Sequence, residues 1–415
     1  MSALIAPPLA LYVHMPWCVR KCPYCDFNSH AAPDQLPERQ YIAALLDDLE
    51  QELPAVEGRP LVSIFFGGGT PSLFTPEAIG EFLAGVRARI DCVEDIEITL
   101  ETNPGTVEHG RFAGYRAAGV TRVSLGAQTF SEPQLKVLGR IHGAGDIQRA
   151  VDELVAAGLD NFNIDLMYAL PGQTLAQAVE DVRAAIALHP THVSHYQLTL
   201  EPGTVFYHRP PVLPDQDASW EMQLACQDVL ATHGFEQYEV SAYARAGKQC
   251  RHNLNYWRFG DYIGIGAGAH GKLTDAGRGR ILRTTRHRQP REYLRHHGAA
   301  RASERRVVVA DELPLEFMLN VLRLREGFAL TEFERYTGLV PAKIELVLER
   351  ARERGLLAHA AGRWVPTDLG RQFLNDLQAM FLPEEPAEAQ ADAPSPVASS
   401  RTNAQILPTE PPRRA

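Results

Sequence analysis

The chain has 415 residues, of which 45% are hydrophobic and 22% charged, and its formal net charge is −10. This length exceeds one ordinary domain of ~100–200 residues, so we expect two or three domains. Six cysteines are too few for a disulfide-stapled secreted module, and the negative charge argues against a protein that coats nucleic acid.

We expect no targeting segment in the first residues of the printed sequence. No charged segment is followed by an apolar one there, and no apolar run approaches the ~20 residues that cross a bilayer. We therefore expect a soluble protein of the cytoplasm, a reducing compartment, in which cysteines are metal ligands or buried thiols rather than disulfides.

Short β-branched or aromatic runs alternate with longer amphipathic runs from residue 9 to about residue 233. This pattern is typical of repeated βα units around a parallel sheet, and six repeats favour an α/β open barrel over residues 1–233. The expected strands are Leu9–Met15, Leu61–Phe66, Ile96–Glu101, Val120–Leu125, Asn161–Met167 and His192–Leu200. The expected helices are Pro37–Leu53, Pro76–Ile90, Val107–Ala118, Gly145–Ala157 and Thr174–Leu188. Reactive loops follow the carboxyl ends of such strands, so a site is expected there.

The remaining chain divides into three parts. Residues 234–306 are expected to be irregular, and within them residues 272–306 hold eleven Lys or Arg against three acids, a local charge of +8. Residues 307–382 are expected to form three helices, a hairpin turning at Gly362 and a final helix, an order that resembles a winged helix. Residues 383–415 lack aromatic side chains and are rich in Pro and Ala, which predicts a disordered tail.

The strongest chemical signal is the set of Cys18, Cys22 and Cys25 directly after the first strand. Three thiolates within eight residues can hold one soft metal centre, either zinc or an iron–sulfur cluster. Three ligands leave a coordination position open, whereas a structural zinc site needs a fourth ligand, for which His14 and His30 are candidates. The other cysteines are scattered singly and are expected to be plain thiols: Cys92, Cys226 and Cys250.

This loop resembles that of the radical S-adenosylmethionine superfamily. In that family three cysteines hold a [4Fe-4S] cluster, and the methionine moiety of S-adenosylmethionine binds the fourth iron. Tyr24 stands where the family places an aromatic residue near the adenine. Gly67–Gly69 and Thr70 follow the second strand, where missing side chains let backbone N–H groups approach the ligand. The resemblance implies a partial (β/α)6 barrel with a [4Fe-4S] cluster and S-adenosyl-L-methionine as cofactors.

The order of motifs over most of residues 9–381 is similar to that of oxygen-independent coproporphyrinogen III dehydrogenase. This similarity implies that cluster-bound S-adenosylmethionine meets Tyr12, Gly68 and Glu101, with His270 as a further candidate. A second S-adenosylmethionine or substrate site is implied at Tyr24, Gly69, Thr70, Gln128, Arg140 and Asp165. Without the family, Glu101 and Asp165 are equally well interpreted as loop or helix-cap charges, and Gln128 and Arg140 as loop polar groups.

Two features depart from the dehydrogenase. Where that enzyme carries a fourth cysteine, this chain has Phe27, which cannot ionise, ligate or relay a hydrogen atom. The segment His252–Trp257 contains a His-Asn-x-x-Tyr-Trp motif and resembles the HemW branch, whose members are regarded as heme chaperones. This second resemblance implies heme as a ligand, a heme acceptor protein as partner, transient contact with a membrane or respiratory complex, and no nucleic acid.

Heme binding suits the side chains of this motif. His252 could ligate iron axially, Tyr256 and Trp257 offer planar faces, and the basic stretch could pair with propionates. From the residues alone, a structural role for His252 is an equal alternative. A core Tyr–Trp pair and a solvated or partner-facing basic patch are the more usual interpretations of the other residues. The glycine-rich run at 263–271 lies too late in the chain for a dinucleotide fold.

Three functions compete at this point. The first is a heme chaperone that binds a [4Fe-4S] cluster, S-adenosylmethionine and heme and transfers heme to an acceptor. The second is oxidative decarboxylation of coproporphyrinogen III by a 5′-deoxyadenosyl radical in porphyrin biosynthesis, against which Phe27 argues, so the status as an enzyme stays open. The third, RNA modification, is disfavoured because the winged-helix-like part is nearly charge-balanced.

Overall fold

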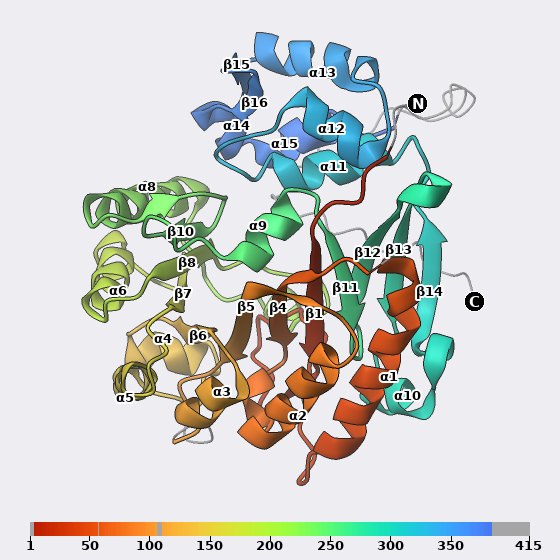
Figure 1. The fold of residues 1–415 in the computed structure, drawn as a ribbon. Helices are drawn as coiled ribbons and strands as arrows, with labels where there is room; N and C mark the ends of the chain where they lie inside the picture. The colour runs from red at the N-terminus through yellow and green to blue at the C-terminus, as the bar shows by residue number, and fades with distance from the viewer. Residues whose placement is uncertain (1–3, 57, 106–109, 384–415) are drawn as a thin grey trace.

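The computed structural model describes residues 4–56, 58–105 and 110–383. One twelve-stranded sheet forms the body of the molecule, in the order β14-β13-β12-β11-β1-β4-β5-β6-β7-β8-β10-β9. Figure 1 shows this sheet flanked by helices, with a separate helical unit above it. The architecture confirms an α/β barrel followed by a smaller carboxyl-terminal domain.

The centre of the sheet consists of six parallel strands, as the βα pattern predicted. They are β1 (Leu9–Met15), β4 (Leu61–Gly68), β5 (Cys92–Thr102), β6 (Arg122–Gln128), β7 (Phe162–Tyr168) and β8 (His192–Gln197). The longer helices that alternate with them are α1 (Glu38–Val56), α2 (Pro76–Arg87), α3 (Phe112–Ala118), α5 (Ala144–Ala156), α6 (Leu175–Ala187) and α8 (Gln216–Thr232). The short helices α4 (Glu132–Val137) and α7 (Val205–His208) were not predicted, and residues 107–109 of the expected third helix lie outside the described residues.

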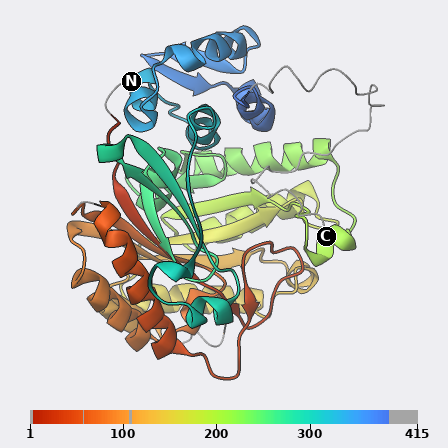
Figure 2. The same ribbon diagram turned by 90° about the vertical axis from the view of Figure 1, so that its right-hand side faces the viewer.

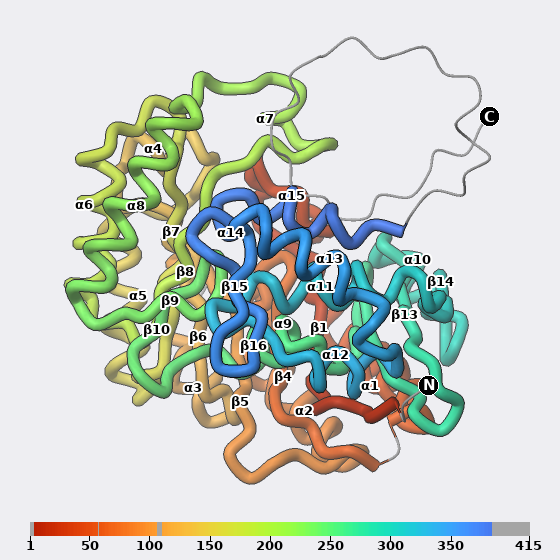
Figure 3. The backbone as a smooth tube through the Cα atoms, turned by 90° about the horizontal axis from the view of Figure 1, so that it is seen from above, coloured from red at the N-terminus to blue at the C-terminus, as the bar shows by residue number. Residues whose placement is uncertain are grey.

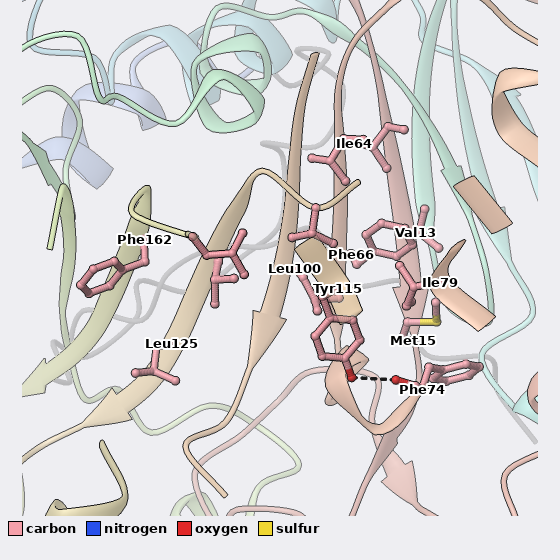
Figure 4. Packing of buried hydrophobic residues seen from close by; sticks show 14 of the residues in the cluster. Val13, Met15, Ile64, Phe66, Phe74, Ile79, Leu100, Tyr115, Leu125 and Phe162 are labelled. Atoms are coloured by element: carbon pink, nitrogen blue, oxygen red, sulfur yellow. Dashed lines mark hydrogen bonds between the residues drawn. The ribbon is translucent and has the colours of Figure 1, made fainter. Parts of the chain in front are cut away.

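Alternation along the strands separates an apolar outer face from a polar interior. In β1, Leu11, Val13 and Met15 are fully buried against the helices, whereas Tyr12 and His14 point the other way. Figure 4 shows Val13 and Met15 in the core between sheet and helices. Burying each such side chain stabilises the fold by about 1.5–3 kcal/mol. The barrel interior is therefore left to polar residues.

The expectation that residues 234–306 are irregular was wrong. They form β9 (Glu236–Gln237), β10 (Ala242–Ala244), α9 (Arg251–Trp257), β11 (Asp261–Ile265), β12 (His270–Asp275), β13 (Arg280–Arg286), α10 (Pro290–Arg295) and β14 (Ala302–Val307). Strand β11 runs parallel to β1, and β12 to β14 extend the sheet as antiparallel strands. Buried charges such as Lys272 and Arg286 occupy positions where apolar residues would have revealed the strands.

Ion pairs, some buried and some exposed, neutralise most of the basic stretch. Nine of its eleven Lys and Arg residues form ion pairs. Arg286 lies 2.8 Å from both Asp48 and Glu52 on α1, and all three side chains are buried. Among the described residues, only Arg288 and Arg291 of this stretch make no ion pair, so the +8 charge is far smaller at the surface than the sequence indicates.

The carboxyl-terminal domain has the predicted winged-helix order. It comprises α11 (Leu313–Val321), α12 (Leu330–Thr337), α13 (Ala342–Glu353), β15 (Leu357–Ala360), β16 (Arg363–Pro366), α14 (Asp368–Gln372) and α15 (Leu374–Ala379). The predicted single last helix is divided at Phe373, whose φ of −109° and ψ of 43° are not helical. Residues 384–415, the expected tail, lie outside the described part of the chain.

This domain packs against the amino ends of the parallel strands. The Ile5 amide donates to the Arg335 carbonyl at 2.9 Å, and the Phe259 ring lies 5.3 Å from that of Phe317 on α11. Figures 1 and 2 place the domain at this end, and in the view from above it lies over α9 (Figure 3). The carboxyl-terminal domain does not cover the opposite end of the barrel, where the carboxyl ends of the parallel strands lie. No described helix is long and apolar enough to span a membrane.

Candidate functional site

The cysteine loop lies at the carboxyl end of β1. Cys18 ends β2 (Trp17–Cys18), which pairs in parallel with β3 (His30–Ala31), so the loop between them is fixed at both ends. Cys22 and Cys25 lie within this loop, where the Cys25 amide donates to the Cys22 carbonyl at 3.3 Å. All three cysteines are half-buried and none forms a disulfide.

A chain of hydrogen bonds links two of the cysteine sulfurs. Thr70 Oγ1 donates to Cys18 Sγ at 3.5 Å and accepts from Asn103 Nδ2 at 3.0 Å. Arg140 donates to Asn103 Oδ1 and, at 3.6 Å, to Cys22 Sγ. Donors to thiolate sulfurs orient metal ligands and tune the bound centre. The sequence had placed Thr70 and Arg140 in the site but did not identify Asn103 as the residue that joins them.

The donor set fits an iron–sulfur cluster better than a structural zinc ion. Both ring nitrogens of His14 are engaged, Nδ1 with Tyr12 Oη at 3.0 Å and Nε2 with the Asn28 carbonyl at 2.8 Å. His30 Nε2 lies 3.2 Å from the Arg288 carbonyl. In the described ranges, no three His, Cys, Asp or Glu groups are close enough to hold a single metal ion. A four-iron cluster spreads its thiolates more widely and needs only the three cysteines.

The raised pKa values of two of the cysteine thiols are consistent with a metal-binding site. Burial raises the pKa of the Cys18 thiol, and it raises the pKa of Cys25 to about 11. Such thiols are protonated near neutral pH, and a metal displaces their protons on binding. Burial thus keeps the Cys18 and Cys25 thiols neutral until a metal would displace their protons.

The glycine segment lets the end of β4 approach β1 closely. Gly68 has a φ of 109°, and a Cβ there would lie 2.5 Å from the His14 ring, so no larger residue fits. The Gly68 amide donates to Glu101 Oε2 at 3.2 Å, and the amides of Gly69 and Thr70 donate at 2.7 and 2.8 Å to carbonyls of β1 and β2. The expectation that these N–H groups face a ligand was wrong, because protein acceptors already occupy them.

Two carboxylates line the barrel interior below the cysteine loop. Burial raises the pKa of Glu101 to about 8, and the charge of Asp165 adds to this effect. Burial also raises the pKa of Asp165, while Asn163 Nδ2 at 2.7 Å and Ser124 Oγ at 3.2 Å donate to its carboxylate. Neither acid caps a helix. A cation such as a sulfonium or ammonium group is the ligand that this interior would stabilise.

Other residues implied by the family lie around the same end of the barrel. Gln128 ends β6 in a left-handed conformation with a φ of 71°, and its Oε1 accepts from Tyr196 Oη at 2.6 Å. Tyr24 packs against Phe206 of α7, with ring centroids 6.4 Å apart. His270 is exposed at the start of β12. The sequence analysis did not identify Tyr196 as a site residue, although its position near the carboxyl end of β8 could have indicated it.

The His-Asn-x-x-Tyr-Trp motif lies at the opposite, amino end of the barrel. His252 on α9 is buried beside the rings of Phe65 and Tyr12, and its Nδ1 lies 3.0 Å from Ser63 Oγ. Burial lowers its pKa to about 3, with a smaller contribution from the charge of Arg122. A porphyrin cannot reach this imidazole without displacing α9, which argues against His252 as an axial ligand.

The two aromatic residues of the motif are also engaged within the protein. Tyr256 packs against Tyr262, with ring centroids 5.1 Å apart. The Arg323 guanidinium lies 4.3 Å from the Trp257 ring. The motif therefore joins the barrel to the carboxyl-terminal domain, and its aromatic faces are used in that contact.

Comparison with known proteins first defines the class. Residues 12–185 match the family model "Radical SAM superfamily", and residues 309–373 match "HemN C-terminal domain". The solved structure of coproporphyrinogen III oxidase (HemN) from Escherichia coli superimposes with a TM-score of 0.75, covering 91% of this chain and 90% of that one. The identity there is 20%, so this likeness concerns the fold alone. The class is a radical S-adenosylmethionine barrel with a HemN-type carboxyl-terminal domain.

Curated relatives then define the family. The heme chaperone HemW of Escherichia coli (strain K12) is 51% identical over 378 residues, which is 91% of this chain and 99% of that protein. HemW of Haemophilus influenzae is 49% identical over 383 residues, and HemW of Bacillus subtilis (strain 168) is 31% identical over 380 residues. The chain belongs to the HemW family.

Proposed function

We propose that this chain is a cytoplasmic heme chaperone that binds a [4Fe-4S] cluster, S-adenosylmethionine and heme and transfers the heme to an acceptor protein. The observation that carries the proposal is the three-cysteine loop above a carboxylate-lined barrel, with Phe27 where a fourth thiol would stand. The relatives named heme chaperones at 51% and 49% identity support it.

Cys18, Cys22 and Cys25 would hold the cluster, which supplies an open iron position and one-electron chemistry when bound. Thr70 and Arg140 donate to two of the sulfurs and so hold the ligands in place. These donors also place positive charge and dipoles beside the sulfurs, which favours the reduced form of a cluster.

The barrel interior would bind the nucleotide cofactor. A bound sulfonium or ammonium cation would lower the raised pKa of Glu101 and Asp165 and pair with their carboxylates. The Tyr196 hydroxyl fixes the side chain of Gln128. Tyr24, packed against Phe206, would offer an aromatic face to the adenine. These residues bind and orient a ligand, and none is assigned a proton transfer.

The experiment that tests the proposal begins with anaerobic purification. Iron, sulfide and heme are measured on one sample, and we expect about four iron and four sulfide per chain together with heme binding. Transfer is then followed as loss of heme absorbance from the loaded chain when an apo-acceptor is added. A chain that assembles the cluster but binds no heme would contradict the chaperone function.

The alternative, a coproporphyrinogen III dehydrogenase, predicts a different outcome. Phe27 is 60% exposed and offers no thiol to the substrate. The reconstituted protein, incubated anaerobically with coproporphyrinogen III, S-adenosylmethionine and an electron acceptor, should therefore make no protoporphyrinogen IX. Steady turnover in this assay would replace the chaperone with the enzyme.

A further inference from the structure

A heme carrier needs three things at one place on its surface. They are an apolar face for the porphyrin, cations free to pair with two propionates, and an imidazole that iron can reach. The His-Asn-x-x-Tyr-Trp motif does not provide them, because His252 is buried and the Trp257 ring already faces Arg323.

Two apolar side chains of the cysteine loop are exposed. Phe27 is 60% exposed, and Val19 is 52% exposed and lines a hollow together with Cys22. Lys21 Nζ donates to the Phe27 carbonyl at 3.2 Å and to the Ser29 carbonyl at 3.4 Å, so its charge is held beside the Phe27 backbone. Lys21 makes no ion pair with any described residue.

A free cation of the basic stretch lies next to the same loop. The carbonyl of Arg288 accepts from Asn28 Nδ2 at 2.9 Å and from His30 Nε2 at 3.2 Å. Arg288 is exposed and, unlike most of its basic neighbours, makes no ion pair among the described residues. Asn28, the residue after Phe27, is therefore hydrogen-bonded to an arginine that forms no ion pair with any described residue.

An accessible imidazole completes the set. Asn28 Nδ2 also donates to the Ala267 carbonyl at 2.9 Å, and Gly268 packs against Asn28 so closely that a Cβ there would lie 2.2 Å from Nδ2. His270 follows this turn and is exposed, with Nδ1 3.3 Å from Thr285 Oγ1, which leaves Nε2 for a ligand. Burial, then Arg283 and Arg288, lower the pKa of His270, while the Glu304 charge raises it. The ring is neutral, as an iron ligand must be.

We propose that heme docks on the loop rim, which we define as Val19, Lys21, Phe27, His270 and Arg288. The porphyrin face lies on Phe27 and Val19, the propionates pair with Lys21 and Arg288, and the iron is ligated by His270. This inference rests on the proposed function and locates its heme site beside the cysteine loop. It also gives a role to a phenylalanine at the position where the dehydrogenase has a cysteine.

The first test is a titration of the anaerobically reconstituted full chain with hemin, followed by absorbance. His270→Ala should shift the heme absorbance maximum and weaken binding, whereas His252→Ala and the exposed-residue control His297→Ala should leave both unchanged. Retained cluster absorbance shows that each variant is folded. If His270→Ala binds heme with the wild-type spectrum and affinity, the rim site is wrong while the chaperone function stands. If the wild type binds no heme, both are wrong.

A second set of variants tests the face and the cations independently of the iron ligand. Arg288→Glu should weaken binding by roughly 10–100-fold, the range expected for losing a charge-assisted pair. Arg354→Glu, an exposed arginine of the carboxyl-terminal domain, serves as its matched control. Phe27→Ser should lower the affinity for heme about tenfold. Its control is Phe373→Ser in the carboxyl-terminal domain, where Phe373 is 44% exposed, and this change should leave the affinity unaltered. Equal affinity for rim variants and controls would overturn the proposal.

Discussion

The two ends of the barrel use similar polar residues for different purposes. At the amino end, Arg122 and His192 are almost completely buried, and both ring nitrogens of His192 are engaged, by Asn163 at 2.6 Å and Tyr238 at 2.9 Å. This end is covered by α9 and the carboxyl-terminal domain (Figure 1). At the carboxyl end the cysteines are only half-buried. Burial, rather than residue type, distinguishes a closed base from a binding site.

This comparison explains why His252 and His270 differ in what they can do. Both are histidines in segments that the sequence associated with a ligand. His252 lies on α9 against the barrel base, whereas His270 is exposed where the sheet meets the cysteine loop. Four substitutions test this contrast: one lies at the amino end of the barrel, and three lie at the carboxyl end or in the interior below it.

The largest effect is expected at the cysteine loop. Cys22→Ser should abolish the cluster, because three thiolates are the full ligand set, and the absorbance at about 400 nm should disappear together with the bound iron. Cys92→Ser, a half-buried thiol outside the loop, should change neither quantity. An intact spectrum in the Cys22 variant would remove this loop from the site.

At the amino end a substitution should affect stability and not the cluster. Asp261 is fully buried between Lys272 at 3.0 Å and Arg59 at 2.8 Å. Asp261→Asn leaves Lys272 buried without its countercharge and should lower the free energy of unfolding by about 3–5 kcal/mol. Denaturant unfolding measures this loss, and the iron content of the protein that remains folded should equal that of the wild type.

Asn103 tests whether the hydrogen-bond chain supports the cluster. Asn103→Ala removes the link between Thr70 and Arg140 and should reduce cluster retention by roughly 10–100-fold, as is typical for partners of metal ligands. The readout is the chelator concentration that bleaches half of the absorbance. Asn161→Ala, at the amino end of β7, is the control. Identical bleaching of the two variants would show that the chain has no such role.

The smallest effect concerns Glu101 and depends on pH. Its pKa is raised from 4.5 to about 8, so the folded state binds this proton more tightly than the unfolded state does. The wild type should therefore lose stability relative to Glu101→Gln as the pH rises from about 4.5 to about 8. We expect a change of about 2–3 kcal/mol in this difference between about pH 6 and about pH 8.5. Thermal melts measure it, with exposed Glu345→Gln as the variant that should show no such trend.

The parallel barrel and the cysteine loop were predictable because each leaves a local pattern. Apolar alternation marked the six strands, and the spacing of Cys18, Cys22 and Cys25 marked the loop. Strands β12 to β14 escaped detection because buried ion pairs, such as Arg286 with Asp48, replace apolar residues on their inner face. The partners of those charges lie more than two hundred residues away in the sequence, and no local pattern reveals them.

The role of individual polar residues was harder to predict for the same reason. Thr70, Asn103 and Arg140 meet only because three strands end at one edge of the sheet. The +8 stretch looked like an open surface because its acidic partners on α1 are remote in sequence. Sequence chemistry indicated which side chains are candidate ligands, and only the fold distinguished the cations that form ion pairs from those that do not.

The pairing of β2 with β3 bears on the order in which the protein is assembled. Both ends of the cysteine loop are secured by backbone hydrogen bonds that need no metal, and the loop lies away from the carboxyl-terminal domain. The polypeptide can therefore complete its folding before iron and sulfide arrive, and a delivery protein can approach the half-buried thiols from outside. If the chain binds the proposed cluster, its insertion would be a late step that can be repeated without unfolding the chain.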